Sequence, residues 1–498
     1  MVSSMTTVFT KSAYLSEFDQ QLKAVRDSVK GAPFVKELGE LYLPNPSNVL
    51  LSDITEPSKK DAFIAAYQKY LKEAEFDDYT GLTEKVMTGK LDFGSADIDV
   101  PDSLQYLLKS SDGDGLTYKG MLENCAQNVL AAKWHVVIAD YKGLSGLDLS
   151  NASAADVEAA NPKVTFKEYP RESVYFASYN VVNNTKQLSF LVLHECGLEV
   201  DQDTMIETEV ESILILGLDE KGNYYQRKKT INAGEETSDS GMISVKINSQ
   251  PIKFIPAFIC SDEELTAGDL PQDLGFLSAI SDVCLARYNV DAKFKAALSK
   301  FVPGIFISGL TEETWKSTQV INGSSVLNMN GVNVLAGNDD GVAPTVEVVS
   351  ASGHLVDFHE YNEESLEKLR SMGASVPSDS NNKTATEAKI DSGQQNAVLI
   401  PIVDNFERMT KMLFSYAAMF EGLVNPDSIS AYEDQIKVML NREFTKVKGT
   451  PEELNAIVNL YVTGLRTKEQ VVRMSHKLGW DTKEVEEVIK ELNQEPEL

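Results

Sequence analysis

Apolar residues recur every three or four positions between residues 269 and 302, in the middle of the chain. They are Leu277, Ile280, Cys284, Tyr288, Phe294, Leu298 and Phe301, and only Asp291 interrupts them. This spacing places one apolar stripe along a helix. Asp269 can cap its N-terminus, Pro271 suits its first turn, and the pair Pro303-Gly304 ends it. The pattern predicts one helix over 269–302, roughly 50 Å long.

Three other stretches have a helical period. Leu15, Phe18, Leu22, Val25 and Val29 predict a helix over 14–40, and Leu366 and Leu369 lie in a helix predicted to start near Glu360 and end at Gly373. The third pattern, within 384–425, consists of Leu399, Ile402, Phe406, Met409, Leu413, Tyr416 and Phe420. Pro401 lies inside it and removes one backbone hydrogen bond, so we expect this helix to be kinked.

From Pro162 the period of the apolar residues changes to two, which is typical of strands. The predicted strands include 188–194, 213–218 and 224–229. Between the last two, Asp219 to Gly222 predicts a hairpin turn, with glycine where a positive φ is needed. An earlier strand is expected at 134–139. Residues 1–265 are therefore predicted to form an α+β body, with helices first and sheet second. Short β segments follow at 304–309 and 346–349, and capping-box sequences at Thr450, Thr467 and Asp481 predict a helical tail.

The charge of the chain restricts its partners. The sequence has 75 acidic and 46 basic residues and a net charge of −29. Tight nonspecific binding to nucleic acid needs clustered cations, so this balance disfavours it. It remains compatible with a surface past which DNA slides without sticking. We also expect no membrane anchor and synthesis in a reducing cytoplasm, because there is no long apolar run and no signal region.

The sequence offers little catalytic chemistry. A phosphate loop is not expected at Thr88-Gly89-Lys90-Leu91, because the other residues of that motif are missing. The segment Asp112 to Gly115 predicts a plain turn and not a calcium loop. The spacing of His354 and His359-Glu360 does not match a zinc-binding motif. The four cysteines lie far apart in the sequence: Cys125, Cys196, Cys260 and Cys284. This spacing predicts reduced cysteines in the core and argues against a metal site or a set of disulfides. For His194-Glu195-Cys196 we expect the histidine to point to the strand face opposite the thiol. We therefore expect a protein that is not an enzyme, with no cofactor, metal or catalytic residue.

The order of these elements resembles the portal proteins of tailed bacteriophages, in the branch long known only as an uncharacterised phage domain. The resemblance covers most of residues 40–425 and lies in the ordered set, since no single motif is diagnostic. The stretches that carry it are Tyr42 to Ser47, Val100 to Gly115, Tyr169 to Val174, Ile255 to Phe258, Asp269 to Tyr288, Gly304 to Gly309, and Glu387 to Ile390 leading into Asn396.

The resemblance implies an α+β portal fold with a defined set of parts. They are a wing (1–265), a first stem helix (266–302), a clip (303–351), a second stem helix (352–372), a tunnel loop (373–383), a kinked helix of the wing (384–425) and a crown (426–498). Such a chain forms a homo-oligomeric ring, usually a dodecamer, at one capsid vertex of the virion. The ring is the channel for DNA packaging and ejection, and it docks the large terminase subunit, the tail adaptor, and the major capsid and scaffold proteins. Double-stranded viral DNA passes through without sequence-specific binding.

The resemblance also suggests functional residues. Candidates for contact with DNA in the channel are Lys293, Lys295, Lys300, Ser378, Asp379, Ser380, Asn381, Asn382 and Lys383. Trp315 is the candidate anchor for the terminase or adaptor. The alternatives are that the lysines are solvated helix ends, that the loop is an ordinary solvent loop, and that Trp315 is a local core residue. The main rival function is another virion or scaffold assembly protein without a DNA channel. An enzyme with an unrecognised site in the 162–260 sheet is a third alternative.

Overall fold

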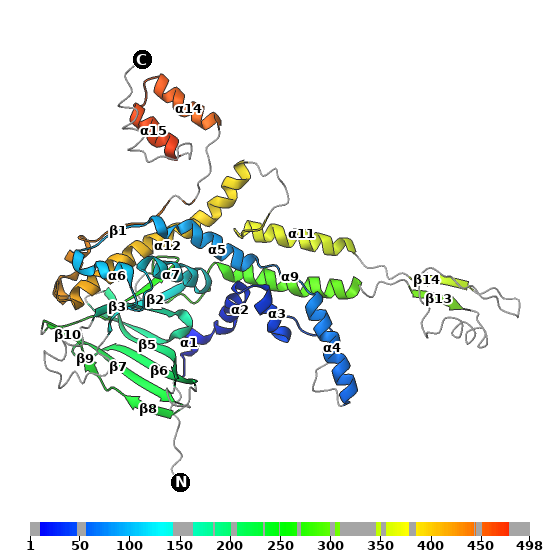
Figure 1. Ribbon diagram of the computed structural model, residues 1–498, viewed down its shortest axis with the longest axis horizontal. Coiled ribbons are helices and arrows are strands. Elements are labelled where there is room, and N and C mark those ends of the chain that lie inside the picture. Colours follow the sequence, from blue (N-terminus) through cyan, green and yellow to red (C-terminus); the bar gives the residue numbers. More distant parts are fainter. Residues whose placement is uncertain are drawn as a thin grey trace, which may run out of the picture. The chain divides into compact units, whose positions relative to one another are not determined.

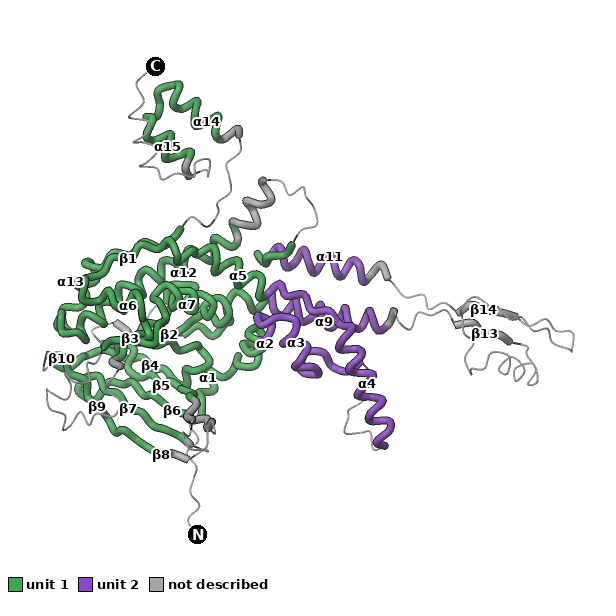
Figure 2. Tube along the Cα trace, in the orientation of Figure 1, with its two compact units in different colours: residues 1–26, 81–279, 372–498 green, residues 27–80, 280–371 purple. Residues whose placement is uncertain are grey.

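The computed structural model describes residues 10–46, 56–142, 163–182, 185–200, 207–232, 235–248, 250–265, 270–298, 304–308, 345–349, 355–377, 385–442, 444 and 451–477. The chain divides into two compact units, each discontinuous in sequence (Figure 2). Unit 1 comprises Met1–Arg26, Gly81–Ala279 and Met372–Leu498, and unit 2 comprises Asp27–Thr80 and Ile280–Ser371. The described residues mix helix and sheet, so the expected α+β class is confirmed.

Both units contain helices (Figure 1). Unit 1 contains α1 (Ala13–Ser16), α6 (Gln105–Lys109), α7 (Tyr118–Ala132), α12 (Ala385–Phe420), α13 (Ile429–Glu433), α14 (Pro451–Val462) and α15 (Lys468–Lys477), with 3₁₀ turns η3 (Phe93–Ser95), η4 (Asp102–Leu104), η5 (Arg171–Ser173) and η6 (Pro426–Ser428). Unit 2 contains α3 (Ala32–Glu37), η1 (Gly39–Leu41), α4 (Pro57–Glu73) and α11 (Leu355–Ser371). Three helices cross a unit boundary: α2 (Asp19–Val29), α5 (Tyr79–Leu91) and α9 (Leu277–Leu298). No described helix combines the length and apolarity that a membrane span needs.

The described strands pair antiparallel throughout. Unit 1 contains β1 (Asp97–Asp99), β2 (Trp134–Lys142), β3 (Lys163–Pro170), β4 (Val174–Val182), β5 (Thr185–Val200), β6 (Glu207–Leu218), β7 (Tyr224–Asn232), β8 (Glu235–Asp239), β9 (Ile243–Ser244), β10 (Lys246–Ile247), β11 (Gln250–Pro251), β12 (Ala257–Ser261) and β15 (Lys437–Met439). One sheet has the order β12-β2-β3, and another runs β4-β5-β6-β7-β8 with β9 paired to β7. The pairs β1-β15 and β10-β11 complete unit 1, and β13 (Gly304–Ser308) pairs with β14 (Thr345–Val349) in unit 2.

The core of unit 1 forms where α7 and α12 lie over the three-stranded sheet (Figure 1). Tyr118, Phe166 and Phe414 meet edge to face with ring centroids 5.0–5.8 Å apart, and the Tyr118 hydroxyl donates to Thr410 Oγ1 at 2.9 Å. Every member of the apolar pattern predicted for 384–425 is buried, which confirms the pattern. Pro401 lies inside α12, and the kink expected there stays a prediction. The helix ends at Phe420, because Gly422 takes a left-handed φ of 73° and Leu423 N–H bonds back to the Ala418 carbonyl at 2.9 Å.

Local turn and cap signals in the sequence are also confirmed. The hairpin between β6 and β7 has Gly222 at φ 75°, and Asp219 Oδ1 accepts bonds from Lys221 N and Asn223 N. Asp112 Oδ1 accepts three backbone N–H bonds at 2.8–3.1 Å, as in a plain turn. Thr467 and Gln470 exchange the two reciprocal bonds of a capping box, each at 3.3 Å.

Two predicted helices are shorter or broken in the structure. The helix expected over 14–40 is divided into α1, α2 and α3, and Gly31 between the last two takes φ 87°. A Cβ at this glycine would lie 2.9 Å from Asp78 Oδ2, so the break is built around a close contact. The boundary between the two units also falls within 1–265, since residues 27–80 group with 280–371, and the assignment of 1–265 as a wing stays a prediction.

The first stem helix was predicted to begin at Asp269, which is wrong, because 270–276 are not helical. The buried Arg171 guanidinium, 2% exposed, uses the carbonyls of this segment. It donates to Asp273 O at 2.7 Å and Gln272 O at 2.6 Å, and also to Ala132 O at 3.0 Å. Trp134 Nε1 donates to Pro271 O at 3.0 Å. With these carbonyls bound to side chains, the helical ladder starts at Leu277.

We expect Arg171→Met to lower the free energy of unfolding by about 2–4 kcal/mol. Methionine keeps much of the aliphatic length of arginine but leaves the buried Ala132 carbonyl and the part-buried carbonyls of Gln272 and Asp273 without their donor. An unpaired buried group costs about 1–3 kcal/mol. Urea unfolding measures the change. The control is Arg408→Met, since Arg408 lies 45% exposed beside Glu264 and such a surface pair contributes about 0–1 kcal/mol. Equal losses in the two variants would contradict the role given to Arg171.

Candidate functional site: the α9 and α11 helix pair

Arg287 on α9 joins this helix to α11 within unit 2. Its side chain is 10% exposed. Nη1 donates to Asn362 O at 3.0 Å and to Ser365 Oγ at 2.5 Å on α11. Nε and Nη2 donate to Asp77 Oδ2 at 3.2 and 2.7 Å. One guanidinium therefore fixes the lengthwise position of α11 against α9 and against the segment before α5.

Aromatic side chains extend the contact between α9 and α11, which we call the seam. The rings of Phe294 and Phe358 stack with centroids 3.6 Å apart and an interplanar angle of 4°. Phe294 follows Arg287 along α9, whereas Phe358 precedes Ser365 along α11, so the two helices run antiparallel (Figure 2). On α9 the predicted stripe residues Leu277, Ile280, Cys284 and Tyr288 are buried, which confirms the first part of the stripe. Phe294 is half-buried, and the side chains of Leu298 and Phe301 lie outside the described residues. Tyr288 meets the edge of Phe76 at 5.7 Å.

The acidic residue that interrupts the stripe has a partner. Asp291 Oδ2 lies 3.0 Å from Lys295 Nζ one turn later, and Glu75 Oε2 lies 2.9 Å from the same nitrogen. Burial lowers the pKa of Lys295, and the two carboxylates outweigh that effect and raise it. The hydrogen bond from Lys295 in turn lowers the pKa of Glu75. Both groups therefore stay charged and compensate each other.

A stripe of acidic residues lies on the outer side of α11. Glu360, Glu363, Glu364 and Glu367 are exposed, and their spacing puts them on one side of the helix. Ser365 and Leu369 on the other side are buried at 7% and 0% exposure. We call these four glutamates the α11 acidic stripe. Their spacing is readable in the sequence, whereas the joint between Arg287 and Asp77 has no sequence signal, since its members come from distant segments.

The structure describes two of the sequence-predicted channel residues. Lys293 is exposed on α9, and Lys295 is bound in the two ion pairs above. Lys300, Trp315, Ser378, Asp379, Ser380, Asn381, Asn382 and Lys383 lie outside the described residues. The stem and channel roles of all these residues therefore stay predictions.

The start of the predicted tunnel loop is fixed to unit 1, contrary to the expectation that 373–383 buries almost nothing. Ala374 and Val376 are each 8% exposed. Gln395 Nε2 donates to Gly373 O at 2.7 Å, and Ser375 N donates to Thr83 Oγ1 at 2.9 Å. The first residues of this segment are held because its two apolar side chains, Ala374 and Val376, are buried. The predicted tunnel loop therefore begins after Val376.

The expected geometry at His194 and Cys196 is wrong. Both lie on β5 two positions apart, so they share a face, and Cys196 Sγ lies 3.7 Å from the imidazole nitrogens. The imidazole stacks on Tyr175 with ring centroids 4.8 Å apart, and Cys196 is exposed. Adjacent residues alternate between faces, but this pair is separated by Glu195.

No family model matches the chain, and no curated protein matches it. Solved structures with a similar chain include "Virion of native gene transfer agent (GTA) particle", with 11% identity, a TM-score of 0.37, and coverage of 72% of this chain and 84% of that one. They also include "Neck of empty GTA particle computed with C6 symmetry", with 10% identity, a TM-score of 0.38, and coverage of 80% and 89%. Both likenesses are distant, so the proposals below stand on the residues of this chain.

We expect Arg287→Met to loosen α11 from α9. The variant loses two bonds to α11 and leaves Asp77 without its cation, and a hydrogen bond to a charged group contributes about 1.5–3 kcal/mol. Amide hydrogen exchange should therefore quicken in α11, with a stability loss of about 2–4 kcal/mol. Lys293→Met on the exposed side of the same helix is the control and should leave exchange unchanged. Unaltered exchange in Arg287→Met would show that the guanidinium does not hold the pair.

Alkaline pH should weaken unit 2 through Tyr288. Burial, followed by nearby Tyr67 and Tyr70, raises the pKa of Tyr288 to about 12 from an ordinary 10.0. The unfolded chain releases this proton first, so the contribution is complete below pH 10 and is lost between pH 10 and 12. The Tyr288 hydroxyl has no hydrogen-bond partner among the described residues, so Tyr288→Phe should cost little at pH 7. It should also flatten the fall in urea midpoint above pH 10. An equally steep fall in both proteins would refute this.

Proposed function

We propose that this chain is the subunit of a portal ring, the channel at one capsid vertex through which viral DNA is packaged and ejected. The observation that carries the proposal is the antiparallel α9 and α11 pair with its outward acidic stripe. Such a pair suits a channel wall, because the two helices pack against each other on one side. The other side of α11 stays exposed and charged.

The chain between the two helices supports the same assignment. Because α9 and α11 run antiparallel, the insert leaves and returns at the same end of the pair. Its described strands β13 and β14 pair with each other, Gly304 opposite Val349 and Ser308 opposite Thr345. In the proposal this insert, 303–351, is the clip that docks the large terminase subunit during packaging and the tail adaptor afterwards, with Trp315 as anchor.

The electrostatics suit passage of DNA without adhesion. DNA carries one phosphate charge per about 1.7 Å, and each subunit presents four exposed carboxylates on α11. At physiological salt the repulsion is screened beyond about 8 Å. It therefore acts only where DNA comes close to the wall, and it prevents sticking without opposing entry. Lys295 is neutralised by Glu75 and Asp291, so Lys293 is the better of the two described lysines for touching phosphate.

The remaining parts follow from the same proposal. Residues 378–383 form the tunnel loop, 384–425 the helix behind it, and 426–498 the crown. The ring, a dodecamer, contacts major capsid and scaffold proteins in the virion and reads no DNA sequence. The chain performs no catalysis in this role.

The test is a double charge reversal in the acidic stripe, Glu363→Lys with Glu367→Lys. Rings with a central hole of DNA width should form as in the wild type by negative-stain microscopy, since both side chains point away from the seam. The fraction of DNA-filled particles should fall several-fold, because lysines in the wall bind phosphate and slow the DNA. The matched control reverses two exposed glutamates of unit 1, Glu123→Lys with Glu220→Lys, and should package normally.

Two outcomes contradict the proposal in different ways. A small monomer in the wild-type preparation removes the ring, and leaves an assembly protein of another kind. Rings with normal packaging in the stripe variant keep the ring but remove the α11 acidic stripe from the channel wall.

A further inference from the structure

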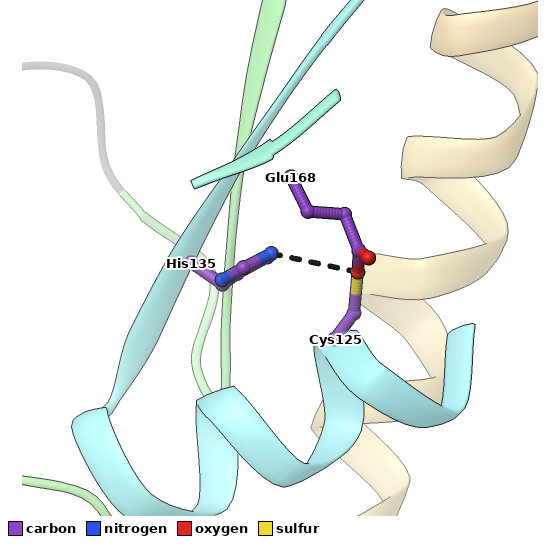
Figure 3. A group of neighbouring side chains, drawn as sticks. All are labelled: Cys125, His135 and Glu168. Carbon is purple, nitrogen blue, oxygen red and sulfur yellow. Dashed lines mark hydrogen bonds and ion pairs between the residues drawn. The ribbon is translucent and has the colours of Figure 1, made fainter. Parts of the chain in front are cut away.

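Three side chains that can bind a metal meet in the core of unit 1. Cys125 comes from α7, His135 from β2 and Glu168 from β3 (Figure 3). Cys125 Sγ lies 3.3 Å from Glu168 Oε1, and His135 Nε2 lies 3.7 Å from the same oxygen. One donor atom from each residue lies within 4.8 Å of the other two. The cluster is separate from the α9 and α11 pair and does not depend on the proposed portal function.

The ring nitrogens of His135 lack hydrogen-bond partners within the described part of the chain. The residue is 0% exposed, and neither ring nitrogen has a hydrogen-bond partner among the described residues. Its backbone is fixed by pairing with Cys260 on one side and Pro170 on the other, so the ring is held where it points, toward Glu168 (Figure 3). An orphaned buried polar group costs about 1–3 kcal/mol, and in native proteins it usually has a cause such as an ion.

The spacing of the donor atoms fits a tetrahedral metal ion. Zn²⁺ binds sulfur at about 2.3 Å and nitrogen or oxygen at about 2.0–2.2 Å, which sets neighbouring donors roughly 3.3–3.7 Å apart. Two of the three donor pairs have this separation, Cys125 Sγ with Glu168 Oε1 at 3.3 Å and His135 Nε2 with the same oxygen at 3.7 Å, and the third pair lies within 4.8 Å. Thiolate and imidazole donors also favour Zn²⁺ over Mg²⁺ or Ca²⁺, which prefer oxygen ligands alone.

We propose that Cys125 Sγ, a ring nitrogen of His135 and Glu168 Oε1 bind one Zn²⁺, with water in the fourth position. On binding, the Cys125 thiol releases its proton to solvent and the thiolate bonds to the metal. Asn124 Nδ2 holds the other Glu168 oxygen at 3.2 Å and orients the carboxylate, as outer-shell partners do in metal sites. The ion ties α7 to β2 and β3 and gives the orphaned imidazole a partner.

The experiment measures metal in the full-length chain purified without chelator, then repeats the measurement after EDTA and reloading with Co²⁺. We expect about one zinc per chain and, in the Co²⁺ form, a near-ultraviolet charge-transfer band that reports cobalt bound to thiolate. Cys125→Ala should abolish the band. Asn124→Ala, which removes only the orienting amide, should weaken Co²⁺ affinity about 10- to 100-fold. Cys196→Ala, on the exposed face of β5, is the matched control and should keep both the zinc and the band.

The design stays decisive if a buried substitution prevents folding, because the wild-type cobalt spectrum needs no variant and Glu168→Gln preserves shape and hydrogen bonding. No stoichiometric zinc and no thiolate band in the wild type would overturn the proposal. A band lost in Cys196→Ala but kept in Cys125→Ala would also overturn it, and would place the metal at His194, Cys196 and Glu211 instead.

Discussion

The buried guanidinium of Arg171 sets where the long helix α9 begins, because it binds carbonyls that an earlier helix start would need. Its three donors bind carbonyls from the end of α7 and from residues 272 and 273, so the backbone cannot become helical until Leu277. A helix that began at Asp269 would turn the carbonyls of residues 272 and 273 along its own axis and take them from the Arg171 guanidinium. The buried cation therefore sets the N-terminal limit of α9.

Several other cations among the described residues are also held by partners within the structure. Lys133 lies 3.1 Å from Asp262 and 3.2 Å from Asp273, Arg26 lies 2.8 Å from Glu172, and Arg287 and Lys295 are paired in unit 2. Cations bound inside the structure cannot attract phosphate, whereas the glutamates of α11 remain exposed. Each of these ion pairs neutralises one cation and one carboxylate, so the excess of acidic residues in the net charge of −29 stays unpaired by them. The exposed glutamates of α11 belong to that excess.

Periodic patterns predicted the fold where local sequence and packing agree. The stripe of α12, the strands from β3 to β7, the hairpin at Gly222 and the cap at Thr467 depend on neighbours in the sequence, so they were readable. The start of α9 was not, because proline and aspartate form a plausible helix start and Arg171, a hundred residues away in the sequence, overrules it. Gly31 broke a continuous helical pattern for a similar reason, its contact with Asp78. Of the candidate site, the sequence indicated Lys293 and the stripe on α9, but the joint made by Arg287, Asp77 and Ser365 needs three distant segments.

The cluster of Cys125, His135 and Glu168 could not be predicted from the sequence at all. Spacing rules identify metal sites whose ligands lie on one or two short segments, and Cys125, His135 and Glu168 satisfy none of them. Their meeting depends on the register of β2 against β3 and on the turn that ends α7 at Lys133, with its φ of 78°. That turn reverses the chain within two residues and brings Cys125 back over the strand that carries His135. A buried imidazole without a hydrogen-bond partner among the described residues then marks the site, and it is visible only once the tertiary structure is known.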